Sequence, residues 1–135
     1  MNTYPTPQSL LPYGPTALLV DMVNTCDQKN ITVTRTVRPD EHYGPGLSLE
    51  GAIELCAQGA ACFNALSTTG GTGPTIGVLA GVEGFGLSRA IVVGEIVVAT
   101  AQKTISMGSL AKYDCTLSDQ SGYQLSHGTL TVGTV

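Results

Sequence analysis

One segment of the chain, residues 49–66, constrains the fold more than any other. It contains no proline and consists mostly of alanine, leucine, isoleucine, cysteine and phenylalanine, a composition that predicts one long helix. Ser48 lies at the expected N-cap, and Glu50 falls in the first turn, where the helix dipole favours a negative charge. The glycine-rich segment 67–74 then ends the helix.

The predicted helix carries a narrow polar stripe. Glu50, Glu54 and Gln58 are spaced four residues apart and therefore share one face. The rest of the surface is apolar, so we expect the helix to be largely wrapped by other elements. The spacing alone leaves two interpretations open: the stripe marks the solvent side of the helix, or Glu54 is a functional carboxylate on a mostly buried helix.

The other segments favour β-strands. Residues 31–37 and 110–117 alternate strictly between apolar and polar side chains, and residues 17–23, 76–87, 91–106 and 123–132 are also strand-like. The order is two strands, the helix and then four strands in a meander. This order predicts an α+β fold, a single antiparallel sheet with one long central helix.

The length of 135 residues fits a single domain, 1–135. Four prolines in its first 15 residues argue against a regular helix there, so we expect 1–15 to form an extended proline-rich N-terminal segment. Only 12% of the residues are charged and 42% are hydrophobic. A small domain with so few charges has difficulty covering its own surface, which predicts an oligomer.

The charge pattern argues against several classes of function. The net charge is −4 and the six basic residues are scattered, whereas nucleic-acid binding needs clustered lysine and arginine.

No apolar run is long enough to span a membrane, and the N-terminus lacks the pattern of a signal peptide, so we expect a cytoplasmic protein. The four cysteines lack the spacing of a metal site, and we expect free buried thiols.

Four segments resemble the bacterial 3-hydroxyacyl-ACP dehydratases, in the order and spacing of that family. Residues 53–58 resemble the Glu-x-x-Ala-Gln segment of its central helix, and residues 10–21 resemble its N-terminal Leu-Pro-His element. Residues 78–85 look like the strand after the helix, and residues 92–95 look like its Pro-Gly-Asp turn. The resemblance covers almost the whole chain and is nearest to the short dehydratase-like proteins of aryl polyene and polyketide-type pathways.

The resemblance implies a hot-dog fold, in which the sheet wraps the helix and two subunits share each active site. It implies Glu54 as the acid that expels the 3-hydroxyl as water and His42 as the base that removes the α-proton. It places Tyr13, Gln58 and Leu49 in substrate binding, with Leu49 at the helix N-terminus that polarises the thioester carbonyl. The substrate would be a thioester of acyl carrier protein or CoA. The assembly would be a homodimer or a heterodimer with a related dehydratase, without cofactor or metal.

The chain also departs from the family pattern around the base. His42 lies 12 residues before Glu54, closer than is usual in the family, and Leu47-Ser-Leu49 replaces the Met-Pro-Gly that normally precedes the helix. Tyr13 stands where the family has the histidine of Leu-Pro-His, and tyrosine is a poor base at neutral pH. Two alternatives to a dehydratase therefore remain: a hot-dog thioesterase that uses Glu54 as general base, and an inactive acyl-binding subunit of a heterodimer.

Overall fold

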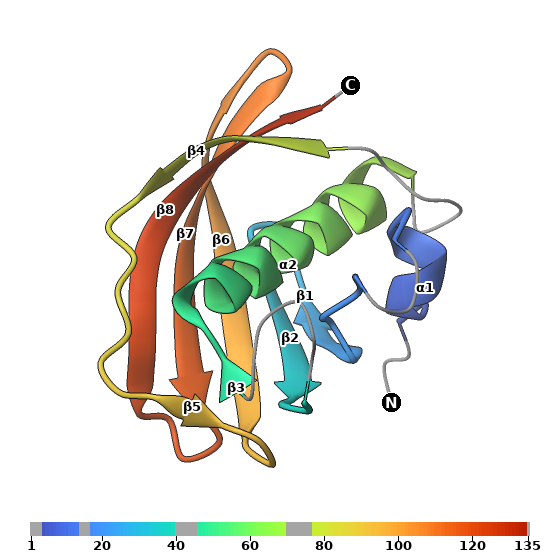
Figure 1. The fold of residues 1–135 in the computed structure, drawn as a ribbon. Coiled ribbons are helices and arrows are strands. Elements are labelled where there is room, and N and C mark those ends of the chain that lie inside the picture. Colours follow the sequence, from blue (N-terminus) through green and yellow to red (C-terminus); the bar gives the residue numbers. More distant parts are fainter. Residues whose placement is uncertain (1–3, 14–16, 40–45, 70–76, 135) are drawn as a thin grey trace.

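A curved antiparallel sheet wraps around one long helix in the computed structural model, which describes residues 4–13, 17–39, 46–69 and 77–134 (Figure 1). The helices are α1 (Pro7–Leu10) and α2 (Leu49–Thr69). The strands are β1 (Met22–Cys26), β2 (Asn30–Thr36), β3 (Gly46–Leu47), β4 (Gly77–Glu83), β5 (Ile91–Val92), β6 (Ile96–Met107), β7 (Leu110–Asp119) and β8 (Gln124–Thr134). The predicted α+β class, with one main sheet around one long helix, is confirmed.

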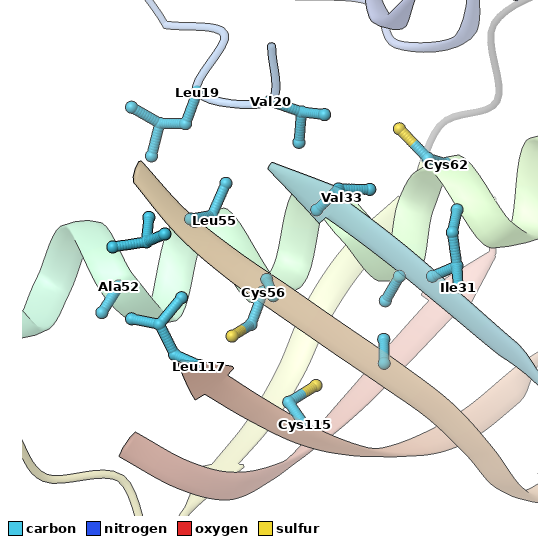
Figure 2. Packing of buried hydrophobic residues seen from close by; sticks show 14 of the residues in the cluster. Leu19, Val20, Ile31, Val33, Ala52, Leu55, Cys56, Cys62, Cys115 and Leu117 are labelled. Atoms are coloured by element: carbon cyan, nitrogen blue, oxygen red, sulfur yellow. The ribbon is translucent and has the colours of Figure 1, made fainter. Parts of the chain in front are cut away.

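Helix α2 begins where the sequence predicts. The Ser48 hydroxyl accepts a hydrogen bond from the Gly51 N–H at 3.1 Å and caps the first turn. Midway along the helix, Gly59 allows a close approach to the sheet, because a β-carbon there would lie 3.3 Å from Cγ2 of Val33. Figure 2 shows Cys56 on the same helix, whose side chain points toward Cys115 of the sheet.

The strand order corrects the predicted meander. The six-stranded sheet has the order β1-β2-β6-β7-β8-β4, so β4 lies at the far edge beside β8 instead of next to the strand that follows it in sequence. The chain after β4 is too long for a hairpin, and part of it forms β5, which pairs with β3 near the start of α2. Gly94, with φ of 99°, makes the turn that splits the predicted strand 91–106 into β5 and β6.

The core lies between α2 and the inner face of the sheet. The alternation in β2 and β7 is confirmed, since Ile31, Val33 and Tyr113 are buried and point inward. Tyr113 meets Phe63 of α2 edge to face, with ring centroids 5.9 Å apart. Arg35 breaks the apolar pattern, because it occupies a core-facing position of β2 and is only 4% exposed.

The N-terminal segment differs from the prediction. Instead of being extended throughout 1–15, it forms one helical turn, α1, within its described part. Pro7 occupies the first turn of α1, where a missing N–H costs no helical hydrogen bond, and Leu10 and Leu11 are buried against the core. The strand predicted at 17–23 starts only at Met22, so residues 17–20 lack strand pairing.

All four cysteines are free. Cys56, Cys62 and Cys115 are buried as predicted, whereas Cys26 is half-buried. Cys56 and Cys115 face each other across the interface between α2 and β7 (Figure 2). Burial, followed by the nearby Cys26, raises the pKa of the Cys62 thiol to about 12, so that this thiol is unreactive in the folded protein. Neither described helix combines the length and apolarity needed to cross a membrane.

Candidate functional site

The polar stripe of α2 runs from the surface into the interior. Glu50 is exposed, Glu54 is half-buried, and Gln58 is only 1% exposed. A stripe that marked the solvent side would stay exposed along its length, so that interpretation fits Glu50 alone. Glu54 lies at the boundary between solvent and core, where a carboxylate can be both reached and held in place.

Gln58 holds four hydrogen bonds at the inner end of the stripe. Its Oε1 accepts from the backbone N–H groups of Leu19 at 2.7 Å and Val20 at 3.3 Å. Its Nε2 donates to the carbonyl of Ala17 at 2.8 Å and to Oε1 of Glu54 at 3.2 Å. Since the two N–H groups can bond only to an oxygen, the amide has one orientation, and its N–H₂ group points toward Glu54.

Gln58 therefore supports the Glu54 carboxylate. Its hydrogen bond to Oε1 restricts the rotamers of Glu54 and leaves Oε2 as the second oxygen for chemistry. The sequence indicated that Gln58 belongs to the site but missed its link to residues 17–20, because that link joins positions 39 residues apart. A direct contact between Gln58 and a substrate stays a prediction.

A small cavity of about 50 Å³ brings Glu54 together with Tyr13. Its other walls are apolar and come from α2, β4 and β8, namely Ala57, Ala61, Leu79 and Val132. The volume suits a water molecule or a group of a few heavy atoms. One carboxyl and one phenol thus face a small, otherwise apolar space. The cavity brings together two of the five residues predicted for the site.

The pKa of the Tyr13 phenol is raised in this setting. Burial is the largest cause that raises this pKa, and the negative charge of Glu54 raises it further. The phenol therefore keeps its proton near neutral pH. This agrees with the interpretation of Tyr13 as a residue that can donate to a substrate oxygen but cannot take up a proton.

Leu49 lies at the first position of α2 and is 37% exposed, but it does not line the cavity. It is five residues before Glu54, about 7.5 Å along the helix axis. The Gly51 N–H is already bonded to Ser48, so a carbonyl that binds this helix end would have to approach the N–H groups nearer Leu49. Binding of a substrate at Leu49 stays a prediction.

Only one of the two histidines, His127, lies among the described residues. His42 lies outside the described residues. His127 is on β8, and its Nε2 lies 2.8 Å from Oδ1 of Asp114 on β7. It is exposed between the buried Ser126 and Gly128, so it faces away from α2. His127 is therefore not part of the Glu54 cavity.

An apolar strand edge adjoins the cavity. Within the described residues β4 pairs only with β8, so its second edge has no strand partner. Val78, Leu79 and Val82 on this strand are 53%, 40% and 41% exposed. Leu79 belongs both to this edge and to the cavity wall. Exposed apolar residues on an open edge are typical of a surface that a partner covers.

A larger hollow of about 540 Å³ lies elsewhere, over strands β1, β2 and β6. Its lining includes Met22, Thr34 and Val98 and none of the residues predicted for the site. The smaller cavity is the better candidate, because it holds a fixed carboxyl group beside a phenol. In the described part of the chain, no group of three or more histidine, cysteine, aspartate or glutamate side chains is arranged to hold a metal ion.

A single antiparallel sheet wrapped around one helix defines the class of hot-dog proteins, and comparison with solved structures agrees. The structure of the dehydratase heterocomplex ApeI:P from Xenorhabdus doucetiae matches with a TM-score of 0.84 and 18% identity, over 98% of this chain and 92% of that chain. A hypothetical thioesterase with coenzyme A from Streptococcus pneumoniae matches with a TM-score of 0.64 and 13% identity, over 84% of each chain. The PaaI protein from the phenylacetic acid degradation operon of E. coli matches with a TM-score of 0.63 and 18% identity, over 82% and 80% of the chains.

The family is narrower than the fold. The model of the ApeP-like family, described as ApeP dehydratase, matches residues 5–134, and the chain belongs to this family. No curated protein sequence is significantly similar to the chain. The predicted hot-dog fold and the predicted relationship to the dehydratases of aryl polyene-type pathways are thus confirmed.

Proposed function

We propose that the protein takes part in the elimination of water from a 3-hydroxyacyl thioester bound to acyl carrier protein or CoA, with Glu54 as the acid. The main support for this proposal is the Glu54 carboxyl group. It is half-buried, is fixed by Gln58 and lines a small, mostly apolar cavity together with Tyr13. Membership in a dehydratase family supports the reaction class.

The reaction needs a base, an acid and a site for the thioester carbonyl. The base removes the α-proton, and the electron pair of that C–H bond forms the double bond between Cα and Cβ. The C–O bond at Cβ breaks at the same time or afterwards, and Glu54 protonates the leaving hydroxyl to give water. Negative charge that develops on the thioester oxygen is stabilised by N–H groups at the start of α2.

His42 is the proposed base. Imidazole suits this role, because its unperturbed pKa lies near neutral pH. The other histidine, His127, is held by Asp114 on the outer side of the sheet. Tyr13 is excluded as base by its retained proton, and it is the proposed donor to the substrate hydroxyl.

A second hot-dog subunit would complete the site. The apolar edge of β4 and the Glu54 cavity share Leu79, so a chain that covers this edge also closes the cavity. The partner is a second copy of this chain or a related dehydratase. The heterocomplex among the similar structures supports the second choice.

The test compares the chain alone with the chain coexpressed with a related dehydratase. Each preparation receives a 3-hydroxyacyl thioester, and mass spectrometry follows the loss of water. The Glu54→Gln variant should lose activity, whereas Glu50→Gln, which changes the exposed glutamate one turn earlier, should keep it. Absence of water loss in both preparations, or full activity of Glu54→Gln, would overturn the proposal.

A thioesterase is the second candidate. The cavity beside Glu54 is large enough for the water that a general base would activate, and similar structures include a hypothetical thioesterase. Release of free thiol, measured with a chromogenic disulfide, together with no formation of enoyl product, would favour hydrolysis. An inactive subunit is recognised differently: it would raise the activity of its partner, and Glu54→Gln in this chain would change nothing.

A further inference from the structure

Arg35 is a buried charged residue at a position where an apolar side chain would suffice to fill the core. It lies on β2 between Val33 and Val37, which are 0% and 2% exposed, and is itself 4% exposed. An apolar residue would continue the pattern of the strand at this position. A guanidinium removed from water costs free energy unless hydrogen bonds hold it, so its contacts indicate what it does.

One contact of Arg35 reaches the segment beside the site. Its Nη1 donates to the carbonyl of Leu19 at 3.1 Å. Residues 17–20 are not part of a strand, and side chains satisfy much of their backbone. Gln58 of α2 binds the N–H of Leu19, and Arg35 of the sheet binds its C=O. The peptide groups on either side of Leu19 are thus held from two opposite elements.

This two-sided contact sets the position of the Gln58 amide. The amide points its N–H₂ group at Glu54 only while its oxygen accepts from Leu19 and Val20. If residues 17–20 shifted, the amide would be free to turn over, and Glu54 would lose its donor. We propose that Arg35 is a positioning residue of the Glu54 site, which acts through the Leu19 peptide and the Gln58 amide.

The inference deepens the proposed function, because it concerns the same carboxyl group. Its first test is nonetheless independent of turnover. In NMR hydrogen exchange, the Leu19 and Val20 amides and the side-chain N–H₂ of Gln58 should exchange about tenfold faster or more in Arg35→Met than in the wild type. Arg38→Met is the matched control, since Arg38 is an exposed arginine three residues further along that binds Asp21. It should leave these three exchange rates unchanged.

The outcomes separate positioning from general stabilisation. A folded Arg35→Met protein with unchanged exchange at Leu19 and Gln58 overturns the proposal. If Arg35→Met does not fold, the same NMR experiment on the wild type tests the contact. The Arg35 guanidinium protons should exchange slowly and show contacts to Leu19. Rapid exchange of these protons overturns the proposal.

Turnover supplies the second test. In thioester dehydration, Arg35→Met should lower kcat by about tenfold and leave KM within about twofold, because Arg35 does not touch the substrate. Arg35→Lys, which keeps a charged donor, should recover part of the rate. Faster exchange with an unchanged kcat would overturn the link to Glu54. If the proposed function is wrong, the wild type will show no turnover. The hydrogen-exchange test still shows in that case whether Arg35 holds the Leu19 peptide.

Discussion

Replacing Gln58 by leucine tests how much of the fold depends on a single buried amide. Leucine has nearly the same volume but removes every hydrogen bond of the side chain. The Leu19 and Val20 amides would lose their acceptor in a place where these residues are 0% and 1% exposed. An unsatisfied buried N–H costs about 1–3 kcal/mol.

The two amides do not contribute equally. The bond to Leu19 is short at 2.7 Å, whereas the bond to Val20 is long at 3.3 Å and contributes less. Ala17 is exposed, so water can replace the amide at its carbonyl. The apolar leucine side chain recovers about 1 kcal/mol through its own burial. We therefore expect Gln58→Leu to lower the free energy of unfolding by about 2–3 kcal/mol.

Urea unfolding followed by circular dichroism measures this difference, which corresponds to a fall of about 1–2 M in the midpoint. Gln102→Leu is the control, because it makes the same change at an exposed position of β6 and should alter the free energy by less than about 0.5 kcal/mol. Gln58→Glu should be destabilised at pH 7 and recover as the pH falls, since two adjacent carboxylates repel until one is protonated. Equal effects of the two leucine variants would refute the reasoning.

Three further outcomes are expected. Gly128→Ala should lower the free energy of unfolding by about 1–3 kcal/mol, seen as a lower Tm, because the new β-carbon would clash with the Phe85 ring. Hydrogen bonds, first that from Ser121, lower the pKa of Asp119 to about 2; this group therefore stabilises the fold above about pH 4, and that contribution is lost as the pH falls toward 2. Acid unfolding of Asp119→Asn should accordingly depend less on pH in this window. Leu79→Asp should prevent the proposed assembly through the β4 edge and give monomers, which light scattering after gel filtration would show.

Local patterns predicted most of the elements. Helix α2 and its Ser48 cap follow from composition and spacing, and β2 and β7 follow from strict alternation. The position of β4 at the sheet edge could not be predicted, because it depends on which distant strand the chain meets after α2. The turn of α1 is not predicted from composition, because four prolines argue against a regular helix, although proline is well suited to a first turn.

In the candidate site, too, local patterns predicted some features, and contacts between distant residues determined the others. The stripe drew attention to Glu54 and Gln58 but left their role open, and the family resemblance predicted site roles for Glu54, Gln58 and Tyr13. The inward course of the stripe became visible only in three dimensions, because helical spacing does not say which side is covered. The contact of Arg35 could not be predicted either, because alternation places Arg35 on the inward face of β2 but does not show that it meets Leu19 in a distant segment.

The open edge of β4 also has a consequence for handling the protein. An unpaired strand that exposes Val78, Leu79 and Val82 offers a template to any other strand in solution. If the proposed partner is a related dehydratase, chain produced in excess over it should aggregate, and the soluble yield should follow the amount of that dehydratase supplied. Yield in coexpression then becomes a simple way to screen candidate partners before any activity is measured.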